Sequence, residues 1–251
     1  MPVPRLGIIC IGLTLLWQAV VWITQVPPYI LPAPKSVVLA LMDHGPELLV
    51  HAGNTLIEIL AGLTIGTIFG AGSALLMMIS RGTKHWIMPV LVISQAIPVF
   101  ALAPLLVLWL GYGLSSKIAM AVLIIFFPVT AAFYDGLRST EPQWLELARV
   151  MDAPPHAVLR EIRIPAALPA FASGLRVATA VAPIGAVVGE WVGSSAGLGF
   201  YMLHANARMQ IDTMFAALVL LSAMALTLYF AVDAALRRII FWQSEQEGTV
   251  R

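Results

Sequence analysis

Three ionisable residues lie within otherwise apolar stretches, and they are the first candidates for chemistry. Glu58 is the only charge in one long apolar run, and Arg176 and Glu190 share a later run. A charge at the centre of a bilayer costs at least ~2.5–3.5 kcal/mol, so such a residue faces a protein interior or an interface. Two interpretations follow. Glu58 or Glu190 pairs with Arg176, or Glu190 faces a path for a polar solute.

A second candidate is a polar interruption of an apolar run. Ser94, Gln95 and Pro98 stand in the middle of residues 86–110. A proline frees backbone groups, and freed groups at membrane depth are tolerated only where they face protein or a water-filled cavity. These three residues are therefore candidates, with Glu190, to line a translocation path.

The remaining reactive side chains lack the patterns of a catalytic or metal centre. No two of the five histidines have the one-turn spacing of a metal site, and Cys10 is the only cysteine. Paired catalytic carboxylates and a G-x-x-x-x-G-K-[ST] nucleotide loop are both absent. The sequence predicts no catalytic residue, no metal and no cofactor bound by this chain, which argues against a membrane-embedded enzyme.

Composition places these residues in lipid. Hydrophobic residues make up 60% of the 251 residues and charged residues only 11%. An average soluble domain has roughly 25% charged residues. So little polar surface cannot cover a water-soluble protein, whereas a bilayer suits this composition. The net charge of +1 gives no basic field for nucleic acid.

Six apolar stretches are near the ~20 residues that a helix needs to cross a bilayer. Backbone groups in hydrocarbon must bond within their own segment, so the predicted fold class is an all-α integral membrane protein. The first stretch is longer than the core of a signal peptide and lacks a small-residue cleavage site, so we interpret it as a retained helix. Residues 1–251 are predicted to form one transmembrane domain with spans at about 6–23, 52–79, 86–110, 118–134, 166–191 and 213–232.

Basic residues give the orientation. If both termini are cytoplasmic, ten of the fourteen lysines and arginines lie on the cytoplasmic side and Arg176 lies within a span. An excess of basic residues on the cytoplasmic side is the rule for membrane proteins. The outer side then holds Lys35, Lys117 and Arg208, and the cytoplasmic side holds Arg5, Arg81, Lys84, Arg138, Arg149, Arg160, Arg163, Arg237, Arg238 and Arg251.

Small residues predict close helix packing in the second span. Gly62, Gly66 and Gly70 are four residues apart and share one helical face. Small residues at this spacing let two membrane helices approach closely. We interpret these glycines as a packing face rather than as a chemical site.

The longest charged connection, residues 135–165, joins the fourth and fifth spans on the predicted cytoplasmic side. Pro154 and Pro155 must end a first short helix, because proline lacks an amide donor and disfavours a helical predecessor. Apolar residues then recur at helical spacing, which predicts a second short helix. Pro165 is expected to end that helix just before the fifth span.

This connection resembles a pattern of the permeases of binding-protein-dependent ABC importers: E-A-A, three residues, G, nine residues, I-x-L-P. The matching residues are Glu146-Leu147-Ala148, Asp152 and Ile162-Arg163-Ile164-Pro165, with the spacing kept throughout. Asp152 replaces a glycine that would permit a left-handed turn. Aspartate tolerates that conformation better than most residues do, so we infer that the turn is kept.

The resemblance implies partners. Such permeases work as two copies with two cytoplasmic ATPase subunits, and an extracytoplasmic substrate-binding protein delivers the solute. The connection docks on the ATPase subunit, which uses the ATP, so the chain would be a transport subunit of a bacterial cytoplasmic (inner) membrane and not an enzyme. The residues expected to form this coupling surface are Glu146, Ala148, Arg149, Asp152, Ala153, Ile162 and Pro165.

The likeness covers about residues 31–242 and indicates a branch of the family. Residues 185–199 are similar to nitrate, sulfonate and taurine permeases. Within that branch, residues 94–101, 181–191 and 204–208 resemble permeases assigned to hydroxymethylpyrimidine, a thiamine precursor. The predicted function is import of hydroxymethylpyrimidine or a related precursor. The alternatives are a sulfonate, taurine or nitrate importer and, from another class, a secondary transporter.

Overall fold

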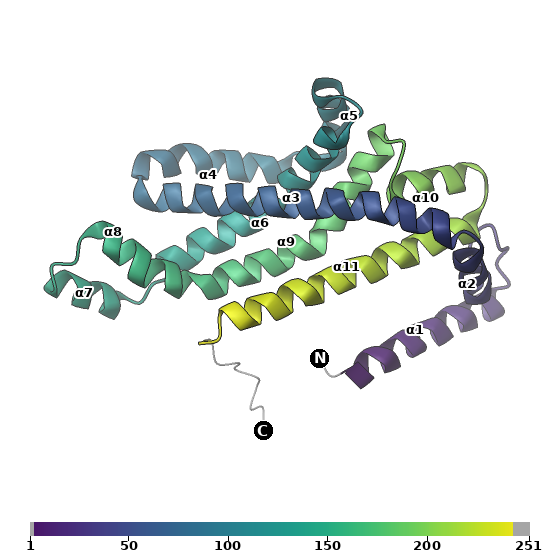
Figure 1. Ribbon diagram of the computed structural model, residues 1–251, viewed down its shortest axis with the longest axis horizontal. Helices are drawn as coiled ribbons and strands as arrows, with labels where there is room; N and C mark the ends of the chain where they lie inside the picture. Colours follow the sequence, from purple (N-terminus) through teal and green to yellow (C-terminus); the bar gives the residue numbers. More distant parts are fainter. Residues whose placement is uncertain (1–2, 243–251) are drawn as a thin grey trace.

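The computed structural model describes residues 3–242, and within that range the chain is helical and has no strand (Figure 1). The all-helical prediction is therefore confirmed. The helices are α1 Val3–Thr24, α2 Pro34–Asp43, α3 Gly45–Ile79, α4 Arg81–Ala96, α5 Val99–Leu110, α6 Leu114–Arg138, α7 Pro142–Val150, α8 Pro155–Ala157, the π-helix η1 Val158–Arg163, α9 Ile164–Gly193, α10 Leu198–Ala207 and α11 Ile211–Ile239.

Five of the described helical segments are long and apolar enough to cross a membrane, and they contain α1, α3, α6, α9 and α11. They correspond to the predicted first, second, fourth, fifth and sixth spans. Most extend beyond the predicted ends. Helix α6, for example, covers Leu114–Arg138 rather than 118–134. The helices continue into the polar residues that flank each apolar run. The run itself does not show how far they continue.

The predicted third span, 86–110, is not one straight helix. It consists of α4 and α5, which meet at an angle of 106°. Ile97 and Pro98 at the break both have extended ψ angles of 122°. The cause lies in Pro98, which has no amide hydrogen and disfavours a helical conformation at the residue before it. The bundle has six crossings if this bent pair counts as one.

Helices α3, α6 and α9 form the centre of the bundle, with α6 packed on both of the others. Gly62, Gly66 and Gly70 lie on the face of α3 that meets α6. A Cβ atom at Gly66 would lie 2.7 Å from Ile125 Cγ2, and one at Gly70 would lie 2.9 Å from Val129 Cγ1. The missing side chains thus let the two helices approach closely.

Candidate functional site

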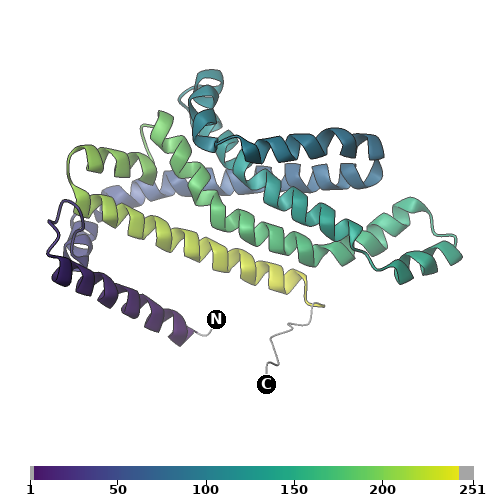
Figure 2. The same ribbon diagram turned by 180° about the vertical axis from the view of Figure 1, so that it is seen from behind.

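The connection between α6 and α9 projects from one end of the bundle, and α10 lies toward the other end (Figures 1 and 2). We call residues 142–163, which form α7, α8 and η1, the elbow. Helix α7 packs against η1, and Ala148 is buried between them with 4% of its surface exposed. Glu146, Arg149 and Asp152 are exposed.

The turn after α7 has the left-handed conformation inferred for Asp152, whose φ is 51°. The amide of Ala153 donates to the carbonyl of Ala148 at 2.9 Å, and the amide of Asp152 donates to the carbonyl of Arg149 at 3.1 Å. These two bonds define the Schellman pattern that ends many helices. The aspartate thus occupies a position at which glycine would be free of strain.

Replacing Asp152 with glycine is expected to stabilise the turn by about 1 kcal/mol, because glycine carries no steric penalty in this conformation. Replacing it with valine should loosen the turn. Hydrogen exchange of the amides in residues 142–153 measures both effects. Met209 has φ 59° at the equivalent end of α10, so Met209→Gly is a matched control that should slow exchange only there. Faster exchange in Asp152→Gly than in the unaltered chain would contradict the assignment.

The second half of the elbow differs from the prediction. Pro165 does not end a separate helix, because α8, η1 and α9 form one continuous helical segment from Pro155 to Gly193. In a regular α-helix the proline ring collides with the carbonyl four residues earlier. The π-helical turn of η1 ends at Arg163, two residues before Pro165, and widens the helix there. The chain therefore passes Pro165 without leaving the helical conformation.

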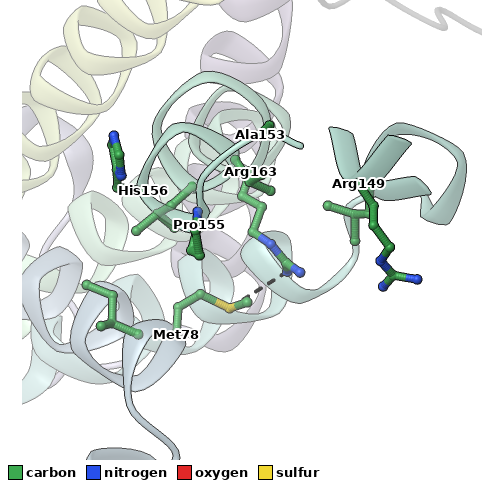
Figure 3. A pocket seen from close by; sticks show the side chains of 10 residues that line it. Met78, Arg149, Ala153, Pro155, His156 and Arg163 are labelled. Carbon is green, nitrogen blue, oxygen red and sulfur yellow. Dashed lines mark hydrogen bonds between the residues drawn. The ribbon is translucent and has the colours of Figure 1, made fainter. Parts of the chain in front are cut away.

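Arg163 fastens the elbow to the bundle. Its Nη1 donates to the carbonyl of Leu137 at 3.0 Å and to Met78 Sδ at 3.9 Å (Figure 3). A cavity of about 780 Å³ lies between the elbow and the end of α3. Its lining consists of Met78, Ile79, Leu145, Arg149, Ala153, Pro155, His156, Val158, Leu159 and Arg163.

The elbow also presents large apolar side chains outside the bundle. Trp144 is 55% exposed, Val150 is 83% exposed and Met151 is 72% exposed. A smaller hollow of about 190 Å³ between α7 and η1 is lined partly by Trp144, Ala153 and Ile162. Exposed apolar patches of this kind mark sites of contact with another protein or with the membrane.

The break between α4 and α5 exposes two of the three predicted path residues. Gln95 and Pro98 are exposed, and Ser94 is half-buried with its hydroxyl donating to the carbonyl of Leu91 at 2.8 Å. No described residue forms a hydrogen bond or ion pair with the side-chain amide of Gln95. Glu190, the fourth candidate, lies elsewhere and is buried.

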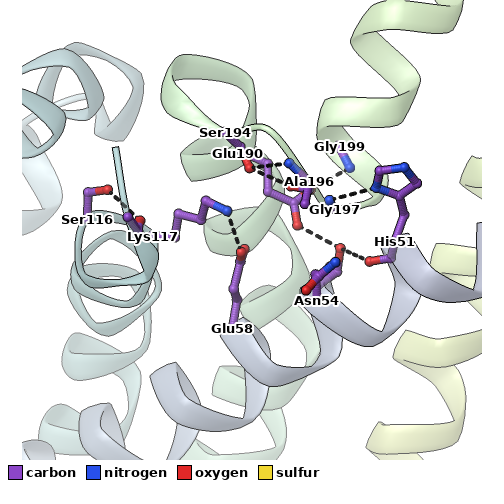
Figure 4. A network of polar contacts seen from close by, with 12 residues as sticks. His51, Asn54, Glu58, Ser116, Lys117, Glu190, Ser194, Ala196, Gly197 and Gly199 are labelled. Atoms are coloured by element: carbon purple, nitrogen blue, oxygen red, sulfur yellow. Dashed lines mark hydrogen bonds and ion pairs between the residues drawn. The ribbon is translucent and has the colours of Figure 1, made fainter. Parts of the chain in front are cut away.

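A buried ion pair joins α3 to α6 (Figure 4). Lys117 Nζ donates to Glu58 Oε1 at 2.7 Å, and the two residues are 7% and 1% exposed. Glu58 Oε2 has no hydrogen-bond partner among the described residues. The expected partner Arg176 was wrong for Glu58, whose partner is the buried Lys117.

Glu190 is 1% exposed and does not meet Arg176 either. Its Oε1 accepts a hydrogen bond from the Thr55 hydroxyl at 2.6 Å, and its Oε2 accepts one from the Gly199 amide at 2.5 Å. Thr55 in turn accepts a bond from the amide of Leu198 at 2.8 Å. The carboxylate therefore links α9 to α3 and to the first turn of α10.

Arg176 has a different partner, which the sequence did not reveal. Its Nε lies 2.6 Å from Asp233 Oδ1, and Arg237 Nε lies 3.0 Å from the other oxygen of the same carboxylate. This group joins α9 to α11. The predicted pairing of Arg176 with a glutamate is thus replaced by pairing with an aspartate just beyond the charge-free part of the last span.

These features define a multi-pass helical membrane protein with a projecting elbow. The chain belongs to the family of binding-protein-dependent transport system inner membrane components, whose model matches residues 62–241. The predicted membership is therefore confirmed. Members of this family are transport components of ABC importers, and this chain is one of them.

Named relatives agree with this family. A probable ABC transporter permease protein of Haemophilus influenzae is 58% identical over 91% of this chain and 94% of its own length. The formylaminopyrimidine transport permease protein ThiX of Halalkalibacterium halodurans is 37% identical over 87% of this chain and 88% of its own. The taurine permease protein TauC of Escherichia coli is 28% identical over 96% of this chain and 90% of its own.

A solved structure shows the same fold. The chain superposes on a chain of the inward-facing MetNI methionine ABC transporter with a TM-score of 0.64 and 21% sequence identity. The match covers 76% of this chain and 96% of the other. The thiamine-precursor resemblance and the sulfonate and taurine branch are both represented among the relatives.

Proposed function

We propose that the chain is the permease subunit that imports hydroxymethylpyrimidine or a related thiamine precursor. The observation that carries the transport role is the elbow, an exposed two-helix unit that continues directly into a membrane-length helix. Support for the solute comes from the 37% identity to a permease named for formylaminopyrimidine. The alternative is a sulfonate or taurine importer, which the 28% identical relatives favour.

The elbow is the proposed docking surface for a cytoplasmic ATPase subunit. Its polar contacts would come from the exposed Glu146, Arg149 and Asp152, and its apolar contacts from the hollow near Ala153 and Ile162. Ala148 holds α7 on η1, and Pro165 lies where η1 continues into α9. Closure of the ATPase dimer on ATP would move this unit as a whole. The ATP is bound and used by the partner subunit.

A second copy of the chain is proposed to cover the break between α4 and α5. Gln95 and Pro98 are exposed at that break in the middle of an apolar segment. Polar side chains and interrupted backbone at membrane depth are stable only against protein or a water-filled cavity. The translocation path is therefore proposed to run between two copies, with Ser94, Gln95 and Pro98 beside it.

The proposed orientation places the elbow and both termini in the cytoplasm and α10 on the outer side. This arrangement gives the cytoplasmic side the excess of basic residues that bacterial membrane proteins have. Arg251, one of those residues, lies outside the described part of the chain. An extracytoplasmic binding protein would deliver the solute to the side that carries α10.

Reconstitution tests this proposal. The chain would be purified with its partner ATPase and binding protein and placed in proteoliposomes. We expect vanadate-sensitive, ATP-dependent uptake of radiolabelled hydroxymethylpyrimidine that unlabelled taurine does not inhibit. Inhibition by taurine would favour the alternative solute. Uptake that continues without ATP would indicate a secondary transporter and overturn the proposal.

A further inference from the structure

The first turn of α10 is held by side chains from two other helices. The amides of Gly197, Leu198 and Gly199 donate to His51 Nδ1 at 3.0 Å, to Thr55 Oγ1 at 2.8 Å and to Glu190 Oε2 at 2.5 Å. The first amides of a helix have no partner within the helix itself. Here α3 and α9 supply those partners, with Thr55 and Glu190 fully buried.

Two glycines make room for the carboxylate. A Cβ atom at Gly199 would lie 2.7 Å from Glu190 Oε2, and one at Gly197 would overlap the same carboxylate. Gly197 also has φ 111°, a conformation that other residues rarely adopt. The Gly-Leu-Gly sequence therefore fits around Glu190, and the negative charge lies at the positive end of the α10 helix dipole.

A second set of contacts fastens the outer face of α10 to α3. The Tyr201 ring lies 5.0 Å from the ring of His51, and its hydroxyl donates to Glu47 Oε2 at 3.1 Å. Burial, together with the neighbouring Glu47 carboxylate, raises the pKa of Tyr201 to about 12. The raised pKa favours the protonated phenol, which is the form that donates this bond.

Helices α3, α6 and α9 are themselves joined tightly. A Cβ atom at Gly185 of α9 would lie 2.7 Å from the Cα atom of Ala121, so the backbones of α9 and α6 are in direct contact. The buried pair of Lys117 and Glu58 joins α6 to α3. The helical segment that begins in the elbow at Pro155 ends at Gly193 after 39 residues, or about 58 Å of helix.

We infer that Glu190 is a positioning residue that fixes α10 to the body formed by α3, α6 and α9. The elbow and α10 are then the two ends of one body, and movement of the elbow by an ATPase displaces α10 on the opposite side. This inference rests on the proposed function, because it takes the elbow as the ATPase contact. It assigns Glu190 to force transmission and not to the lining of the solute path.

A covalent link tests the inference directly. His51→Cys and Tyr201→Cys, in a Cys10→Ser chain, place two thiols where the rings now meet, and a short bifunctional methanethiosulfonate reagent bridges them. If α10 stays fixed to α3 throughout transport, the bridged transporter should take up solute at least as fast as the unbridged one, which has lost the contacts of His51 and Tyr201. Loss of uptake on bridging would show that α10 must move relative to α3, which overturns the inference.

The Glu190→Gln variant provides a second test of the inference. Loss of the carboxylate should lower uptake by at least about fivefold, the lower end of typical coupling effects, and raise the ATP hydrolysed per solute. Bridging residues 51 and 201 should then restore uptake. Failure of the bridge to restore it would indicate that Glu190 contacts the solute, and unaltered uptake in Glu190→Gln would also refute the inference. If the unaltered complex shows no ATP-dependent uptake, the proposed function itself fails.

Discussion

Glu146→Lys is expected to abolish ATP-driven uptake while leaving the chain folded. Glu146 is exposed on α7 and forms no hydrogen bond or ion pair with the described residues, so its replacement should cost little stability. In the proposed complex the carboxylate would accept hydrogen bonds from the ATPase subunit. Losing one charge-assisted bond and introducing the opposite charge costs about 3 kcal/mol, which corresponds to roughly 100-fold weaker docking.

The measurement compares uptake in proteoliposomes with co-purification of the ATPase subunit. Glu141→Lys is the matched control, because Glu141 is an exposed glutamate directly before the elbow and outside the motif. It should leave uptake within about threefold of the unaltered chain, as most exposed substitutions do. Equal loss in both variants would mean that the elbow responds to charge in general. Full uptake in Glu146→Lys would remove Glu146 from the docking surface.

The long apolar helices could be predicted from sequence because the bilayer dictates their length and composition. The end of the first elbow helix was also predictable, since Pro154 and Pro155 cannot continue it. The left-handed turn at Asp152 was inferred from the glycine that the resembling permeases have at this position. The angle between α4 and α5 was not predictable. Pro98 and its polar neighbours predict a break in the third span. The 106° angle of the bend, however, depends on what packs against α4 and α5.

The partners of the buried charges could not be predicted, for a different reason. Lys117 and Glu58 are 59 residues apart, and Arg176 and Asp233 are 57 apart. Both pairs form only when separate helices take their places in the bundle. Lys117 lies at the edge of an apolar run, so charge counting placed it on the outer side of the membrane and did not address its burial. The glycine-lined approach of α6 to α3 instead carries it into the core.

Lys117→Met is therefore expected to be strongly destabilising. Glu58 is 1% exposed, and Lys117 supplies its only hydrogen bond among the described residues. Removing one member of a buried pair leaves an uncompensated charge and costs about 3–5 kcal/mol. The midpoint of thermal unfolding in detergent should fall well below that of the unaltered chain.

A double substitution separates loss of the pair from loss of packing. Lys117→Met combined with Glu58→Gln removes both charges and should recover most of the lost stability, because neutral replacements of buried pairs are often tolerated. Lys84→Met is the matched control, since Lys84 lies 5.5 Å above the Tyr134 ring. It should cost only about 0.5–1 kcal/mol. If the double variant is no more stable than Lys117→Met alone, the uncompensated charge of Glu58 is not the cause of the lost stability.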